Sequence, residues 1–171
     1  MAEKKAVILV EDLYEDMEFW YPYYRLLEAG YAITVVAPEK DRVYTSKHGY
    51  PAKSEAAPKE IDVRSVDVLV VPGGYAPDKL RRYDAILDLV REVYDKGGVV
   101  GMICHAGWVP ISAGITKGRK VTSVSAIKDD LVNSGADFVD QPLVVDERLV
   151  SSRTPDDLPA FMKGILETAH R

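Results

Sequence analysis

The 171-residue chain contains a single cysteine, Cys104, and only three histidines, His48, His105 and His170. One cysteine cannot form a disulfide within the chain, so we expect the protein to reside in a reducing compartment, the cytoplasm. The four side chains also show none of the ligand spacings that are typical of structural zinc sites. We therefore expect no metal centre.

The sequence also has no long hydrophobic run and no excess of positive charge. Its apolar runs are far shorter than the roughly 20 residues that span a bilayer, and the first residues, MAEKK, do not have the form of a signal peptide. The net charge is −5, and no block of like charges indicates a tail that binds nucleic acid. We expect neither a membrane nor a nucleic acid as a partner.

What the sequence does contain is the composition of an ordinary globular domain, with 47% hydrophobic and 29% charged residues. A chain of this length can form one domain with a full hydrophobic core. Internal repeats, low-complexity segments and linkers are not evident in the sequence. We therefore interpret residues 1–171 as a single domain.

Short apolar runs alternate with helical patterns along most of the chain. Strands are predicted at residues 6–10, 31–38, 67–74, 99–104 and 119–123, with short strands or hairpins in 39–60 and 142–152. Helices are predicted at residues 12–30, from 77 onward, and at 84–96, 105–114, 126–135 and 154–170. This alternation predicts an α/β fold, a mostly parallel sheet with helices on both faces.

The ligand site of such a sheet lies outside the carboxyl ends of its strands. Three polar segments are predicted to lie there: Asp12–Glu18, Gly73–Asp78 and Cys104–His105. Asp12 and Glu15 also have the spacing of a capping box, which predicts that the first helix begins near Asp12.

Cys104 lies between a predicted buried strand and a predicted helix, which is the arrangement of a nucleophile elbow. A thiol at a helix N-terminus can be acidified from a pKa of about 8.5 to roughly 3.5–7.5. The neighbours Gly101, Ala106 and Gly107 are small, as a tight turn requires. The alternative is a buried cysteine that belongs to the core, since cysteine is among the most buried residue types.

The carboxylates of Glu15 and Glu18 are three residues apart and share a helix face, where one of them could exchange a proton with the thiol. The alternatives are a helix cap for Glu15 and a solvated face for Glu18. Gly73 and Gly74 could offer backbone N–H groups to an oxyanion, or could simply end a strand. Asp78 could orient a histidine, or could be an acid that stabilises a first helical turn.

The histidines leave similar alternatives open. His105 could contact the thiol if the chain forms an elbow, or could lie exposed at the start of a helix. His48 follows a lysine in a glycine-containing turn, where a solvated loop position is the simpler interpretation. His170 lies next to the chain end, where side chains are often poorly ordered.

Taken in order, the motifs of the chain resemble those of the DJ-1/PfpI family, and within it the PfpI-like intracellular proteases. The resemblance extends over nearly the whole sequence, through the segments EDMEFWYPYYRLLEAG, KHGY, LVVPGGYAPDKLR, ICHAGWVPISAGITKGRKVTS, IKDDLVNSGADFVD and LVSSRTPDDLPAFM. It implies a flavodoxin-like sandwich similar to that of class I glutamine amidotransferases. It also implies a homo-oligomer, either a dimer or a hexamer.

The resemblance further implies roles for individual residues. Cys104 corresponds to the family's nucleophile and His105 to the histidine beside it. Glu18, with Glu15 nearby, corresponds to the glutamate that bonds the cysteine. The backbone N–H groups of Gly74, Gly73 and His105 correspond to an oxyanion hole. Asp78 corresponds to an acid that reaches the histidine of a neighbouring subunit. Departures from the family pattern occur at Gly107-Trp108, at Val124 and at Asp78, which is shorter than the usual glutamate.

These residues support two classes of function. The first is a cysteine-dependent enzyme without a cofactor, in which Cys104 attacks the carbonyl of a peptide, a glyoxal adduct or a 2-oxoaldehyde. The second is a non-enzymatic stress protein or holdase chaperone that senses oxidation of Cys104. A glutamine amidotransferase domain is a weaker third hypothesis, because it needs a histidine and an acid downstream of the cysteine, and His170 is the only histidine there.

Overall fold

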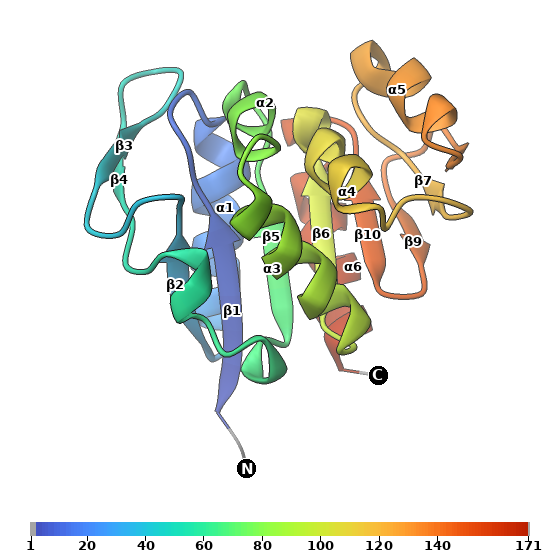
Figure 1. The fold of residues 1–171 in the computed structure, drawn as a ribbon. Coiled ribbons are helices and arrows are strands. Elements are labelled where there is room, and N and C mark those ends of the chain that lie inside the picture. The colour runs from blue at the N-terminus through green and yellow to red at the C-terminus, as the bar shows by residue number, and fades with distance from the viewer. Residues whose placement is uncertain (1–2, 171) are drawn as a thin grey trace.

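A six-stranded sheet forms the centre of the computed structural model, which describes residues 3–170 (Figure 1). The strand order is β2-β1-β5-β6-β10-β9, and all neighbours are parallel except β10 and β9. The strands are β1 (Lys4–Leu9), β2 (Tyr31–Val36), β5 (Val68–Val71), β6 (Val99–Ile103), β9 (Val144–Asp146) and β10 (Leu149–Ser152). The predicted mostly parallel sheet is confirmed.

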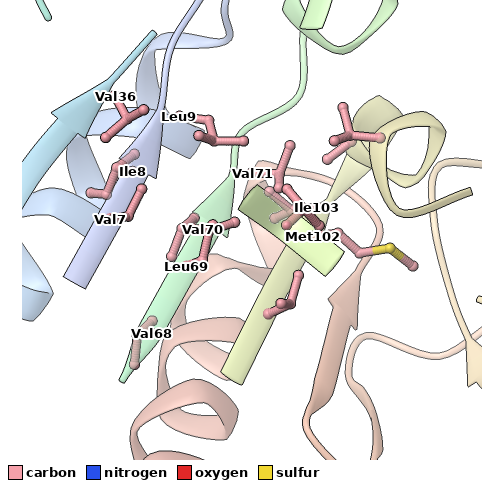
Figure 2. Packing of buried hydrophobic residues seen from close by; sticks show 14 of the residues in the cluster. Val7, Ile8, Leu9, Val36, Val68, Leu69, Val70, Val71, Met102 and Ile103 are labelled. Atoms are coloured by element: carbon pink, nitrogen blue, oxygen red, sulfur yellow. The ribbon is translucent and has the colours of Figure 1, made fainter. Parts of the chain in front are cut away.

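The central strands are buried because their side chains on both faces are apolar. Every residue of β5 and β6 is buried, as expected of strands that are covered by helices on both sides. Figure 2 shows this packing for the labelled residues Val68, Leu69, Val70, Val71, Met102 and Ile103. The sheet therefore gives the carboxyl ends of β5 and β6 a rigid base.

Helices cover both faces of the sheet, as the sequence predicted (Figure 1). On one face lie α1 (Asp16–Glu28) and α6 (Leu158–Ala169), and on the other lie α2 (Ala76–Leu80), α3 (Asp84–Asp95) and α4 (Trp108–Ala113). The short α5 (Lys128–Asn133) lies beyond the β10 side of the sheet. Among residues 3–170, no helix combines the length and the hydrophobicity needed to cross a bilayer.

Two small sheets lie beside the central one. The strands β3 (Val43–Thr45) and β4 (Pro51–Lys53) form an antiparallel hairpin, and β7 (Lys120–Val121) pairs in parallel with β8 (Asp137–Phe138). The predicted hairpins within 39–60 and 142–152 are confirmed. The strand predicted at 119–123 is shorter and lies outside the main sheet, and the N–H of Thr122, just beyond it, donates to the side chain of Ser151 (2.9 Å).

The first helix begins at Asp16 rather than near Asp12, so the predicted capping box is wrong. The carboxylate of Asp12 instead accepts a bond from the Thr45 N–H (2.9 Å) and pairs with Arg42 (3.0 Å). Glu15 is the N-cap residue, but its side chain makes no capping bond. The carboxylates of Asp12 and Glu15 are instead bound by residues in or next to the β3–β4 hairpin.

Candidate active site

Cys104 lies at a sharp turn directly after β6. Its φ is +62°, a left-handed conformation that non-glycine residues rarely adopt. A 3₁₀ turn over Cys104–Gly107 follows, and α4 begins at Trp108. The side chain is partly buried rather than sealed in the core. The predicted sharp turn between strand and helix is therefore present, at the carboxyl end of a central parallel strand.

Gly73 is the point at which Glu18 and Cys104 converge. The Gly73 N–H donates to Oε2 of Glu18 at 2.8 Å. A Cβ atom at Gly73 would collide with that same oxygen and would lie 2.9 Å from the Cβ of Cys104. The absence of a side chain at Gly73 thus allows the carboxyl group and the cysteine to approach from two different elements.

The carboxyl group of Glu18 is completely buried, and its Oε1 has no hydrogen-bond partner among the described residues. Burial, reinforced by the negative charge of Glu15, raises the pKa of Glu18 to about 8. Glu18 is therefore a neutral carboxylic acid at pH 7 and can donate a hydrogen bond or a proton.

The thiol of Cys104 is not acidified in this setting. Burial, followed by the charge of Glu18, raises the pKa of Cys104 to about 12, although backbone N–H donors on His105 and Gly74 oppose the shift. Burial thus opposes the acidification that the sequence predicted, and the six-residue α4 begins four positions after the sulfur. Forming the thiolate requires a nearby proton acceptor and a Glu18 that stays protonated.

His105 is such an acceptor. Its Nδ1 lies 3.3 Å from Sγ of Cys104, so the elbow brings the two adjacent side chains together. Burial lowers the pKa of His105, with a further contribution from the charge of Lys47. The ring is therefore a neutral imidazole at pH 7, and in the Nε2–H tautomer its Nδ1 can accept the thiol proton.

Gly74 joins the site to the loop that precedes α1. Its φ is +78°, and a Cβ there would lie 2.5 Å from the carbonyl oxygen of Leu13 and 2.6 Å from the N of Glu15. The backbone N–H groups of Gly74 and His105 lower the pKa of the Cys104 thiol, which places both near the sulfur. The Gly73 N–H is already bonded to Glu18, so two of the three predicted oxyanion donors remain available.

Lys47 is a charged residue of the site that sequence reasoning did not single out. Its ammonium nitrogen lies 3.0 Å from Oε2 of Glu15, and its charge acts on both Cys104 and Glu18. Lys47 reaches the site because the β3–β4 turn folds over the start of α1. A contact between segments about thirty residues apart leaves no local signal in the sequence.

Three other candidate residues lie outside this cluster in the single chain. Asp78 lies on α2, half exposed, and pairs with Arg82. His48 is exposed and pairs with Asp16 at 2.7 Å. His170 contacts Lys4, at the beginning of β1 and thus at the opposite edge of the parallel sheet from the elbow.

The ligand atoms of Glu15, Asp16 and His48 lie within 4.8 Å of one another. However, Glu15 pairs with Lys47, and Asp16 accepts a bond from the hydroxyl of Ser46 (2.6 Å) as well as pairing with His48. These contacts already satisfy the carboxylates, and the lysine supplies a positive charge beside them.

Replacing Gly73 with alanine should disrupt the site. The new methyl group would displace the Glu18 carboxyl group or the Cys104 backbone, and overpacking of this kind lowers the free energy of unfolding by roughly 2–3 kcal/mol. Urea unfolding and the rate of alkylation of Cys104 would measure the two effects. Wild-type stability together with wild-type alkylation would contradict the packing described for Gly73.

Comparisons with known proteins all point to one protein family. Residues 4–168 match the DJ-1/PfpI family. The protein named deglycase PfpI of Pyrococcus furiosus is 41% identical over 163 residues, covering 95% of this chain and 98% of that protein. The Escherichia coli protein named protein/nucleic acid deglycase 2 is 37% identical over 165 residues, covering 95% of this chain and 96% of that protein.

A solved structure shows the same fold. It is a two-domain protein of Anabaena variabilis with DJ-1/ThiJ/PfpI-like and ferritin-like domains, and it matches with a TM-score of 0.94 at 36% identity. The match covers 96% of this chain and 48% of that one, so the present chain spans about half of the two-domain protein. The expected flavodoxin-like α/β sandwich is confirmed.

Proposed function

The chain belongs to the DJ-1/PfpI family, and from this premise we propose that it is a cysteine-dependent enzyme in which Cys104 attacks the carbonyl carbon of 2-oxoaldehydes or of their adducts with amines. The observation that carries the proposal is the convergence of a neutral imidazole and a buried carboxylic acid on one strained cysteine. The names of two relatives as deglycases support this substrate class.

The first step joins Sγ to the aldehyde carbon. Nδ1 of His105 takes the thiol proton as the S–C bond forms and the C=O π bond breaks. The N–H groups of Gly74 and His105 stabilise the developing negative charge, and the proton passes to the new oxygen to give a hemithioacetal. Glu18 stays protonated throughout this step, so its charge does not oppose the sulfur.

The following steps need only proton movement and one water molecule. For a 2-oxoaldehyde, a base removes the hydrogen from the hemithioacetal carbon, and a proton returns to the adjacent carbon, which leaves a thioester. Water then breaks the S–C bond, giving a 2-hydroxy acid and the free thiol. The substrate aldehyde is oxidised and its ketone reduced, so no external redox partner is required. Glu18 and His105 are the groups placed to carry these protons.

A substrate panel tests the proposal. Wild-type protein would be given methylglyoxal, a methylglyoxal adduct of an N-protected amino acid, and a fluorogenic peptide. The assay should quantify the 2-hydroxy acid or released amine over many turnovers, since aldehydes also form reversible adducts with buffer thiols and amines. We expect turnover of the first two substrates. Turnover of the peptide alone, or of none, would reject the assignment.

The unpartnered Oε1 of Glu18 favours a second candidate function, redox sensing. A buried carboxylic acid beside the sulfur can donate to an oxygen of a cysteine sulfinate and stabilise it. Mild peroxide treatment followed by intact-mass spectrometry should then show selective addition of two oxygens at Cys104, and Glu18→Gln should reduce it. Progressive oxidation to the three-oxygen form without a stable intermediate would exclude this role.

The proposal includes assembly into a homo-oligomer. One face of α1 and the adjacent hairpin form a largely apolar groove of about 770 Å³, and Met17, Tyr24 and Tyr50 on it are each more than half exposed. Helix faces of this composition are typical of interfaces.

Charge placed in the groove should therefore dissociate the oligomer. We expect Met17→Glu with Tyr24→Glu to lower the molar mass in size-exclusion chromatography with light scattering to that of a monomer. Leu27→Glu is the matched control, because Leu27 is 53% exposed on the same helix but does not line the groove. A monomeric wild type, or an unchanged mass in the double variant, would reject this interface. Asp78→Asn tests separately whether that acid completes the site of a neighbouring subunit.

A further inference from the structure

Lys47 brings a positive charge to the edge of the candidate active site and has no role in the chemistry above. It lies in the turn between β3 and β4, and two contacts fix that turn on the segment that leads into α1. The Lys47 N–H donates to the carbonyl of Tyr14 at 2.9 Å, and the hydroxyl of Ser46 donates to Asp16 at 2.6 Å. The ammonium group is thereby held 3.0 Å from Oε2 of Glu15.

Glu15 connects this lysine to the reactive pair, which consists of Glu18 and Cys104. Its N–H donates to the carbonyl of Gly73 at 3.2 Å, and the Gly73 N–H donates to Glu18 at 2.8 Å. The side chain of Glu15 is largely buried. The negative charge of Glu15 raises the pKa of Glu18, whereas the positive charge of Lys47 lowers it. The two charges thus act on the pair in opposite directions.

We propose that Lys47 is a positioning residue of this active site: its ammonium group, held by Glu15, balances the negative charge that Glu18 and Cys104 share. The inference rests on the proposed function and extends it to a residue outside the reacting groups. When the thiol ionises, the buried groups Glu18 and Cys104 carry one negative charge. Without Lys47, the negative charge of Glu15 beside them would be unpaired and would oppose that ionisation.

The groups that face the pair come from three elements. Glu15 precedes α1, Lys47 lies on the β3–β4 turn, and His105 lies on the 3₁₀ turn after β6. Burial lowers the pKa of His105, so its ring is neutral and does not supply the compensating charge. Asp16 and His48 lie next to this cluster but pair with each other. The positive charge that remains is that of Lys47.

The test is the pH profile of alkylation of Cys104 by iodoacetamide, followed by intact mass. Cys104 is the only thiol in the chain, so the rate reports its ionisation directly. Between pH 6 and 9, where the Lys47 ammonium is charged, Lys47→Gln should displace the profile by about one pH unit toward higher pH and so slow alkylation roughly tenfold at a given pH. Lys47→Arg keeps the charge and should stay within a few tenths of a unit of wild type.

Glu15→Gln should move the profile the other way, toward lower pH, because it removes a negative charge. The double variant Lys47→Gln with Glu15→Gln should return close to wild type, since both opposing charges are gone. If Lys47 had only a structural role, the pH profile of the double variant would be displaced from that of wild type as far as the profile of Lys47→Gln. If Lys47→Gln fails to fold, the Glu15→Gln profile carries the test, and an unchanged profile there would overturn the proposal.

Lys53→Gln is the matched control, because Lys53 is an ion-paired lysine of the same hairpin, 3.1 Å from Asp41. It should leave the profile unchanged. An unaltered profile in Lys47→Gln, or an equal displacement in Lys47→Arg, would overturn the proposal. The alkylation assay needs no substrate. If the profiles respond as expected but the substrate panel shows no turnover, the proposed reaction fails and the charge balance by Lys47 stands.

Discussion

Replacing Cys104 with serine is expected to lower kcat/KM on 2-oxoaldehydes by at least about 10³-fold. The serine hydroxyl is a weaker nucleophile than a thiol and less acidic, so its proton is harder for the neutral His105 imidazole to remove in this site. Formation of 2-hydroxy acid under multiple-turnover conditions would measure the loss. Because the chain has no other cysteine, the variant contains no thiol that could produce a background.

The change should affect activity far more than stability. Serine is close to cysteine in size, and the backbone at Cys104 retains its φ of +62° in either case. Cys104→Ala is the companion variant, since it also removes the hydroxyl. Thermal unfolding within a few degrees of wild type would show that the fold is intact. Substantial turnover by either variant would mean that the sulfur is not the nucleophile.

The elbow itself was predictable because its causes are local. An apolar strand, small neighbours and a following helical pattern occur together in one short stretch around Cys104, and each acts on the adjacent backbone. The parallel sheet was predictable for a similar reason, since fully buried strands such as β5 and β6 have no polar face. Local pattern and global fold agree in these elements.

The electrostatics of the site could not be predicted in this way. A cysteine before a helix indicated an acidified thiol, but burial and the charge of Glu18 raise the pKa of Cys104. The capping box failed for a related reason: Asp12 prefers the Thr45 N–H and Arg42, which the hairpin brings from about thirty residues away. Lys47 escaped notice because it arrives on the same hairpin. Sequence spacing carries no information about which distant turn will cover a site.

Replacing Glu18 with glutamine is expected to stabilise the protein at alkaline pH while reducing its activity. The folded-state pKa of Glu18 is about 8, against an ordinary value of 4.5. Between these values the native state holds a proton that the unfolded chain has lost, so the free energy of unfolding falls as pH rises through this window. A glutamine does not titrate and does not incur this loss. The difference in the free energy of unfolding between variant and wild type should favour the variant by on the order of 4 kcal/mol more at pH 8.5 than at pH 4.

Urea unfolding of both proteins at pH 4, 6 and 8.5 would measure this divergence. Glu28→Gln is the control on the same helix, because Glu28 is exposed and its surface ion pair with Arg25 contributes little to stability. The glutamine carbonyl can still accept the Gly73 N–H, so the local packing is preserved. Activity should nevertheless fall by about 10²–10³-fold, since an amide cannot donate or accept the protons that the reaction moves. A difference in stability that stays constant with pH would mean that Glu18 is ionised in the native protein, and the buried acid would then have no part in the chemistry.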